Sequence, residues 1–264
     1  TVRRGFRAEK ARNWKRAYPE VTRSRSPEWV PLDLSALFNR PLCGHDAWIG
    51  MHMQLDQLPG GLHTIHGVPF RTAAPLPPDV NAAIALRSER LKDTAGRPLP
   101  RCVRIPVSRT CRAVYFLHGA GFVAEYGPLA VYRFVYADGT QCSVPVLGLG
   151  KTAASRSEMA RRERRAAVQD WWPTYPQFEN RHARKVIVSK GDEPADCRYL
   201  YTLQWLNPRP DKVLREIRLE SDPRSSAALL VLALLPVALT MTLIWKIKEA
   251  ILHSVFHPQN LAGN

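Results

Sequence analysis

Short apolar or alternating runs, each closed by turn residues, fill most of the chain beyond its first 28 residues. In the clearest of them Tyr132, Phe134 and Tyr136 recur at every second position and would share one face of a strand. Asp138-Gly139 then predicts a tight hairpin into a second strand over Gln141–Leu147. About ten such runs with no regular helix between them indicate an all-β fold, an antiparallel β-sandwich of the jelly-roll type.

Proline and glycine are frequent enough to support this interpretation. The chain of 264 residues contains 22 prolines and 15 glycines, which argues against a protein built from long helices. Hydrophobic residues make up 45 % of the sequence, enough for a proper core. The length suits one large β domain or two small domains, and we expect a single sandwich.

The net charge of +15 is concentrated in two segments. Thr1–Arg16 carries seven Lys or Arg against one Glu, and Lys151–Val168 carries six against two. Such runs suit anionic lipid head groups or an acidic protein partner, and a merely solvated basic surface is the alternative. The basic runs contain no recognisable nucleic-acid-binding motif, so we expect no nucleic acid partner.

These patterns divide the chain into a basic N-terminal arm (1–28), the sandwich domain (29–235) and a membrane-associated helix with a tail (236–264). Within the sandwich, residues 153–169 are rich in Ala, Arg and Glu and contain neither Gly nor Pro. They predict an exposed helix inserted between strands. Its basic patch consists of Arg161, Arg162, Arg164 and Arg165.

The C-terminal apolar run allows two interpretations. Ser226–Trp245 has no charged residue and is long enough to cross a bilayer as one helix. Alternatively, Ala227–Leu235 is a last buried strand and Pro236 opens an amphipathic helix that contacts a membrane or a partner. The predicted contact residues are Leu239, Leu243, Ile244, Trp245, Lys246, Ile247, Lys248 and Ile251.

The stretch from Gly148 to Thr152 ends in Gly-Lys-Thr, like a phosphate-binding loop. The first glycine of that loop would stand five residues before Gly150, where this chain has Pro145. Proline has no N–H to donate to a phosphate, so we predict no nucleotide site and no cofactor. A strand followed by a glycine-containing turn is the expected structure.

Other candidate residues predict structural roles better than chemical ones. His118-Gly-Ala-Gly121 is similar to an oxyanion-hole loop, but the chain lacks a G-x-S-x-G nucleophile motif, so we expect a buried turn histidine. His63 and His66 would point to opposite faces of one strand. Three acidic residues are candidate calcium ligands, but the chain has no acidic calcium-binding loop motif. Three tryptophans are candidate sugar platforms, and core packing is their preferred role. These residues are Asp33, Asp46, Asp56, Trp171, Trp172 and Trp205. We therefore predict no catalytic residue and no metal site.

Six stretches occur in an order that resembles a non-catalytic bacterial β-sandwich domain of the galactose-binding-like, carbohydrate-binding-module type. They are VPLDLSALFN (Val30–Asn39), LPGGLHTIHGVPF (Leu58–Phe70), VYFLHGAGF (Val114–Phe122), YRFVYADGT (Tyr132–Thr140), DWWP (Asp170–Pro173) and LQWLNPRPDKVLREIRLES (Leu203–Ser221). The resemblance implies a jelly roll over about Trp29–Leu235 and places the last strand at Ala227–Leu235. The basic arm, the insertion and the C-terminal helix depart from it.

We therefore expect a non-catalytic accessory subunit that docks on a membrane protein complex and on anionic lipid. A carbohydrate-binding module of the cell envelope is the alternative, and an enzyme is a third class. Exposed Trp and Tyr on one sandwich face would favour sugar, whereas buried aromatic residues would favour assembly. Lys246 and Lys248 after the apolar run weakly favour an extracytoplasmic, periplasmic sandwich.

Overall fold

The computed structural model describes residues 2–23, 28–45, 47, 55–73, 77–123, 127–149, 166–172 and 176–238. The helical elements are α1 (Val2–Asn13), α2 (Pro19–Arg23), η1 (Ser35–Leu37) and η2 (Pro194–Asp196). The strands are β1 (Arg40–Pro41), β2 (Gly61–Ile65), β3 (Val68–Thr72), β4 (Asn81–Ala85), β5 (Cys102–Arg109), β6 (Cys111–Gly121), β7 (Gly127–Tyr136), β8 (Gln141–Leu149), β9 (Ala166–Gln169), β10 (Ala183–Val188), β11 (Arg198–Leu206), β12 (Leu214–Ser221) and β13 (Ala228–Ala238).

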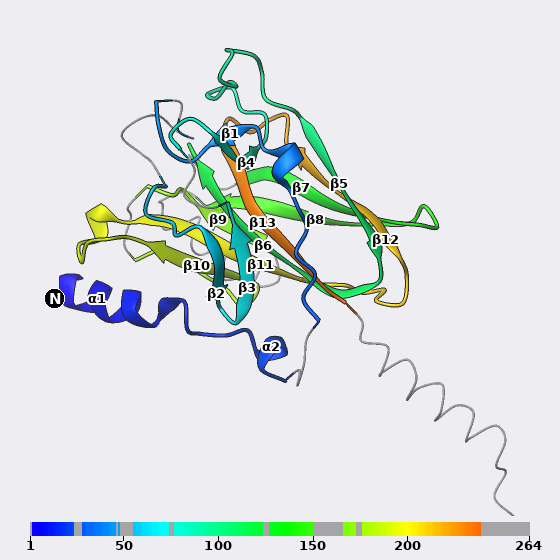
Figure 1. The fold of residues 1–264 in the computed structure, drawn as a ribbon, viewed down its shortest axis with the longest axis horizontal. Helices are drawn as coiled ribbons and strands as arrows, with labels where there is room; N and C mark the ends of the chain where they lie inside the picture. Colours follow the sequence, from blue (N-terminus) through cyan, green and yellow to red (C-terminus); the bar gives the residue numbers. More distant parts are fainter. Residues whose placement is uncertain are drawn as a thin grey trace, which may run out of the picture.

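Two large sheets make up most of the described part of the chain, which is mostly β as predicted (Figure 1). One has six strands in the order β1-β4-β13-β6-β11-β10, and the other has five in the order β5-β12-β7-β8-β9. The strands β2 and β3 form a separate hairpin. Within the described ranges, neighbouring strands run antiparallel except β8 and β9, which are parallel. The antiparallel sandwich is therefore the observed architecture.

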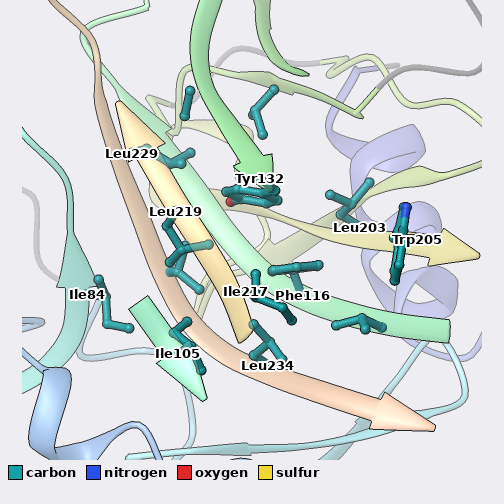
Figure 2. Close-up of a cluster of buried hydrophobic side chains, with 14 of the residues drawn as sticks. Ile84, Ile105, Phe116, Tyr132, Leu203, Trp205, Ile217, Leu219, Leu229 and Leu234 are labelled. Atoms are coloured by element: carbon teal, nitrogen blue, oxygen red, sulfur yellow. The ribbon is translucent and has the colours of Figure 1, made fainter. Parts of the chain in front are cut away.

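The core between the sheets combines aliphatic and aromatic side chains (Figure 2). Tyr132, Phe134 and Tyr136 of β7 are completely buried, which confirms that they share an inward face. Phe134 stacks on Trp205 of β11 with ring centroids 3.5 Å apart, and Tyr132 stacks on Phe116 of β6 at 4.6 Å. The predicted hairpin between β7 and β8 is also present, with Gly139 at a φ of +82°.

The six-stranded sheet is buried on its second face as well. The β2–β3 hairpin contributes Ile65, Val68 and Phe70 to a second apolar cluster, and residues of the N-terminal segment and of loops join it. Tyr18 and Trp171 lie there. Every residue of β10 and nearly every residue of β6, β11 and β13 is therefore buried. Burial on both faces favours continuous apolar strands over alternating ones.

The apolar run near the C-terminus is the strand β13, between β4 and β6. It continues to Ala238, so the prediction that Pro236 opens a helix is wrong. The Pro236 carbonyl accepts a hydrogen bond of 3.0 Å from the Val30 N–H. The N–H and C=O positions of one strand residue point to the same side, so the position of the absent Pro236 N–H faces the segment from Glu28 to Leu32. No hydrogen bond between β13 and β6 is therefore lost at this proline. No helix in the described part of the chain is long and apolar enough to span a bilayer.

The insertion also differs from expectation at its end. Ala166–Gln169 is the strand β9, parallel to β8, and not the last turn of a helix. Residues 150–165 lie outside the described part. Gly148 lies inside β8, where an added Cβ would stand 2.7 Å from Leu129 Cδ2, so packing requires the glycine. Gly150 and the rest of the Gly-Lys-Thr sequence lie outside the described residues.

Candidate functional site

The predicted contact residues from Leu239 to Ile251 and the basic patch from Arg161 to Arg165 lie outside the described residues. The structure does show where these segments join the sandwich. Leu149 ends β8 beside Gln169, and the next residue, Asp170, bridges to Ala120. Ala120 in turn pairs with Leu229 at the start of β13. The insertion therefore departs near one end of β13, about 30 Å from Ala238 at the other end.

The basic N-terminal segment is folded onto the sandwich and is not a free arm. Phe6 of α1 is completely buried in a small cluster beside β10 and β11. Arg3 pairs with Glu193 at 2.6 Å, and Arg7 pairs with Asp192 at 3.1 Å. These ion pairs are exposed and individually weak, so Phe6 makes the larger contribution to docking.

An asparagine completes the edge of β10. The Asn13 side-chain amide donates to the Lys185 carbonyl at 2.9 Å, and its Oδ1 accepts from the Ile187 N–H at 2.9 Å. The Trp14 Nε1–H donates to the Ile187 carbonyl at 3.1 Å. Side chains thereby pair with the outer strand of the six-stranded sheet, which would otherwise offer a free edge.

A buried polar cluster joins the N-terminal segment to the β2–β3 hairpin. Thr202 Oγ1 lies 2.8 Å from His66 Nδ1 and 2.9 Å from the Tyr18 hydroxyl. The Arg184 guanidinium lies 4.1 Å from the centroid of the Tyr18 ring. His66 occupies the hairpin turn with a φ of +53°, so placing it in a strand with His63 was wrong. The cluster holds three segments together but is closed to solvent at Tyr18 and His66.

His118 lies inside β6, which corrects the predicted turn. Its Nδ1 lies 2.8 Å from the Tyr132 hydroxyl, and the ring is completely buried between the sheets. Its Nε2 has no hydrogen-bond partner. A substrate cannot reach a ring in this position, so the similarity of His118–Gly121 to an oxyanion-hole loop does not extend to the structure.

The described aromatic residues do not form a platform for sugar. All six described tyrosines are buried, as are Trp171 and Trp205, and Trp172 is the one described aromatic residue with a largely exposed side chain, at 51 %. No group of three His, Cys, Asp or Glu side chains within the described ranges is arranged to hold a metal ion. Asp33 caps the Ser35 N–H at 2.9 Å, and Asp46 lies outside the described part.

Two of the surface hollows in the described part of the chain lie beside β13. The larger, of about 580 Å³, lies where β13 changes its neighbour from β4 to the segment before η1, and Leu32, Arg71, Asn81 and Leu232 line it. The smaller, of about 170 Å³, lies beside the end of β13 and is lined by Val21, Trp29, Leu206 and Val237 among others. Sequence reasoning found neither, because residues from distant segments form both.

No known protein family, curated protein or solved structure matches this chain. The resemblance to galactose-binding-like domains is therefore carried by the six quoted stretches alone.

Two buried histidines in the described part of the chain, His66 and His118, predict a loss of stability in acid. Burial lowers the pKa of His118 to about 3, and burial with Arg184 and Arg16 nearby lowers the pKa of His66 to about 3. Both have a pKa of about 6.5 in an unfolded chain, so below that pH the unfolded state binds protons that the folded state does not. Each histidine should therefore lower the free energy of unfolding by about 2 kcal/mol between pH 6.5 and pH 4.5.

Urea titrations at both pH values measure this loss. His118→Gln and His66→Asn should each remove about 2 kcal/mol of the pH dependence, whatever their cost at neutral pH. Asparagine suits the second position because it tolerates a positive φ. An unchanged pH dependence in both variants would contradict the assignment.

Proposed function

We propose that this protein is a non-catalytic accessory subunit, a β-sandwich of the jelly-roll type that docks on a membrane protein complex. Residues after Ala238 contact the bilayer, and the sandwich faces the extracytoplasmic side. The observation that carries the proposal is the burial of the described tyrosines and of Trp171 and Trp205, which leaves Trp172 as the one largely exposed described aromatic residue. Sugar-binding faces present aromatic rings to their ligand, so this arrangement favours assembly.

Two further features support assembly. The described part of the chain has no group of side chains arranged for a metal, and its two histidines with an unpaired ring nitrogen, His66 and His118, are both completely buried. The N-terminal segment uses part of its charge in ion pairs with the sandwich, so the region after β13 becomes the principal candidate for contact with other molecules.

Cross-linking in native membranes tests the proposal. The full chain should be cross-linked to a defined integral membrane protein, and the chain ending at Ala238 should not. A glycan array supplies the opposing outcome, because saturable sugar binding by the chain ending at Ala238 would overturn the proposal in favour of a carbohydrate-binding module.

A further inference from the structure

Three segments meet at the end of the sandwich from which the chain departs after β13 (Figure 1). Ala238 pairs with Cys111, and Ala113 pairs with Leu206 at the end of β11. The Ala137 N–H donates to the Val213 carbonyl at 2.9 Å, which adds the β7–β8 turn. We call this surface, formed by residues 109–112, 137–140, 206–213 and Ala238, the exit end.

Positive charge predominates at the exit end. Arg109, Arg112 and Arg209 are exposed, and Lys212 is partly exposed. The two carboxylates of the same loops are Asp138, which pairs with Lys212, and Asp211. The exit end therefore carries four basic side chains and two acidic ones.

Apolar side chains lie among these cations. Six large hydrophobic side chains are exposed within the described ranges, and two of them, Leu206 at 43 % and Val213 at 42 %, belong to the exit end. Leu206 also lines the smaller hollow with Trp29 and Val237. Glu20 at that hollow is paired with Arg181 at 3.1 Å, so its charge is offset.

We propose that the exit end rests on the head groups of an anionic lipid bilayer. The inference rests on the proposed function, which places residues 239–264 at a membrane. Successive Cα atoms are about 3.8 Å apart, so the surface beside Ala238 must then lie within a few ångströms of that membrane. Arg109 and Arg209 contact lipid phosphates, and Leu206 and Val213 lie at the depth where apolar chains begin.

Vesicle flotation of the full chain tests this inference. The wild-type chain should float with vesicles containing about 30 % phosphatidylglycerol and less with pure phosphatidylcholine. The double variant Arg109→Glu and Arg209→Glu should lose about 10-fold or more in partitioning, because two attractions become repulsions. In about 0.5 M salt, screening should reduce the difference to about twofold.

A matched control separates the effect of the position of the substitutions from the effect of the change in net charge. Arg71→Glu with Arg101→Glu makes the same change in charge at exposed sites, and Arg101 precedes β5 whereas Arg109 ends it, about 25 Å away. This control should lose about threefold or less. Circular dichroism and thermal melting confirm folding. Arg109→Gln with Arg209→Gln replaces the double variant Arg109→Glu and Arg209→Glu, here called the exit variant, if that variant does not fold.

The outcomes distinguish failure of this inference from failure of the proposed function. Flotation of the exit variant equal to wild type, or an equal loss in the control, overturns the inference and leaves the proposed function standing. If the full chain binds membranes only when they contain protein, the partner is a protein and the inference is also overturned. A full chain that binds neither vesicles nor native membranes overturns the proposed function itself.

Discussion

Ending the chain at Ala227 is expected to abolish cooperative folding, whereas ending it at Ala238 is expected to leave a folded, soluble sandwich. The shorter chain lacks β13, which lies between β4 and β6 in the middle of the six-stranded sheet. Seven large apolar side chains of β13 are almost completely buried, and each is worth about 1.5–3 kcal/mol. Their combined loss is as large as the total stability of a typical domain, about 5–15 kcal/mol.

Circular dichroism and urea unfolding without detergent measure both chains. The two differ by the eleven residues of β13 and so form a matched pair. The account is wrong if the chain ending at Ala227 still unfolds cooperatively, since the apolar run would then be an appendage of the fold. It is also wrong if the chain ending at Ala238 needs detergent to stay in solution.

Replacing either of two neighbouring leucines of β13 should be severely destabilising. Leu234 lies in the core between the sheets, and Leu235 lies in the cluster on the opposite face of the six-stranded sheet. Both are at most 2 % exposed. We expect Leu234→Ala and Leu235→Ala each to lower the free energy of unfolding by about 2–5 kcal/mol, because each leaves a cavity.

The pair is informative because neighbouring residues of a strand point to opposite faces. In a sheet with one solvent face, one of the two substitutions would cost about 0.5 kcal/mol or less. Leu62→Ala is a control for that case, since Leu62 lies in a strand but is 59 % exposed. Two unequal losses, one as small as that of Leu62→Ala, would refute burial on both faces.

Local patterns predicted much of the fold. Aromatic residues at every second position predicted β7, and Asp138-Gly139 predicted the hairpin that follows it. Both signals depend only on residues that are close in sequence. The uniform run of β13 carries no such alternation. A bulge at Leu232 further shifts its pairing with β6, so Leu232 and Ala233 both lie on the second face. Nothing local distinguishes this strand from an apolar helix.

Long-range contacts explain the remaining errors. His66-Gly67 and His118-Gly119 look alike in sequence, yet the first forms a hairpin turn and the second lies inside β6. The basic N-terminal segment was predicted to be an arm because its acidic partners within the protein, such as Glu193, are distant in sequence. Ala166–Gln169 follows a helix-like composition but pairs with β8, so tertiary pairing overrides propensity there.

An engineered disulfide can show whether β13 lies beside β6 in the register described above. Leu229 and Ala120 are partners, and the Leu229 carbonyl accepts from the Leu86 N–H on its other side. Leu229 therefore forms a non-hydrogen-bonded pair with Ala120, with Cα atoms about 4.5 Å apart, which a disulfide can bridge. Oxidation of the variant Leu229→Cys with Ala120→Cys, followed by peptide mapping, should give a link between these two positions. Leu230→Cys with Ala120→Cys should give none, because the two side chains lie on opposite faces. The absence of the first link, or equal linking in both variants, would contradict the account.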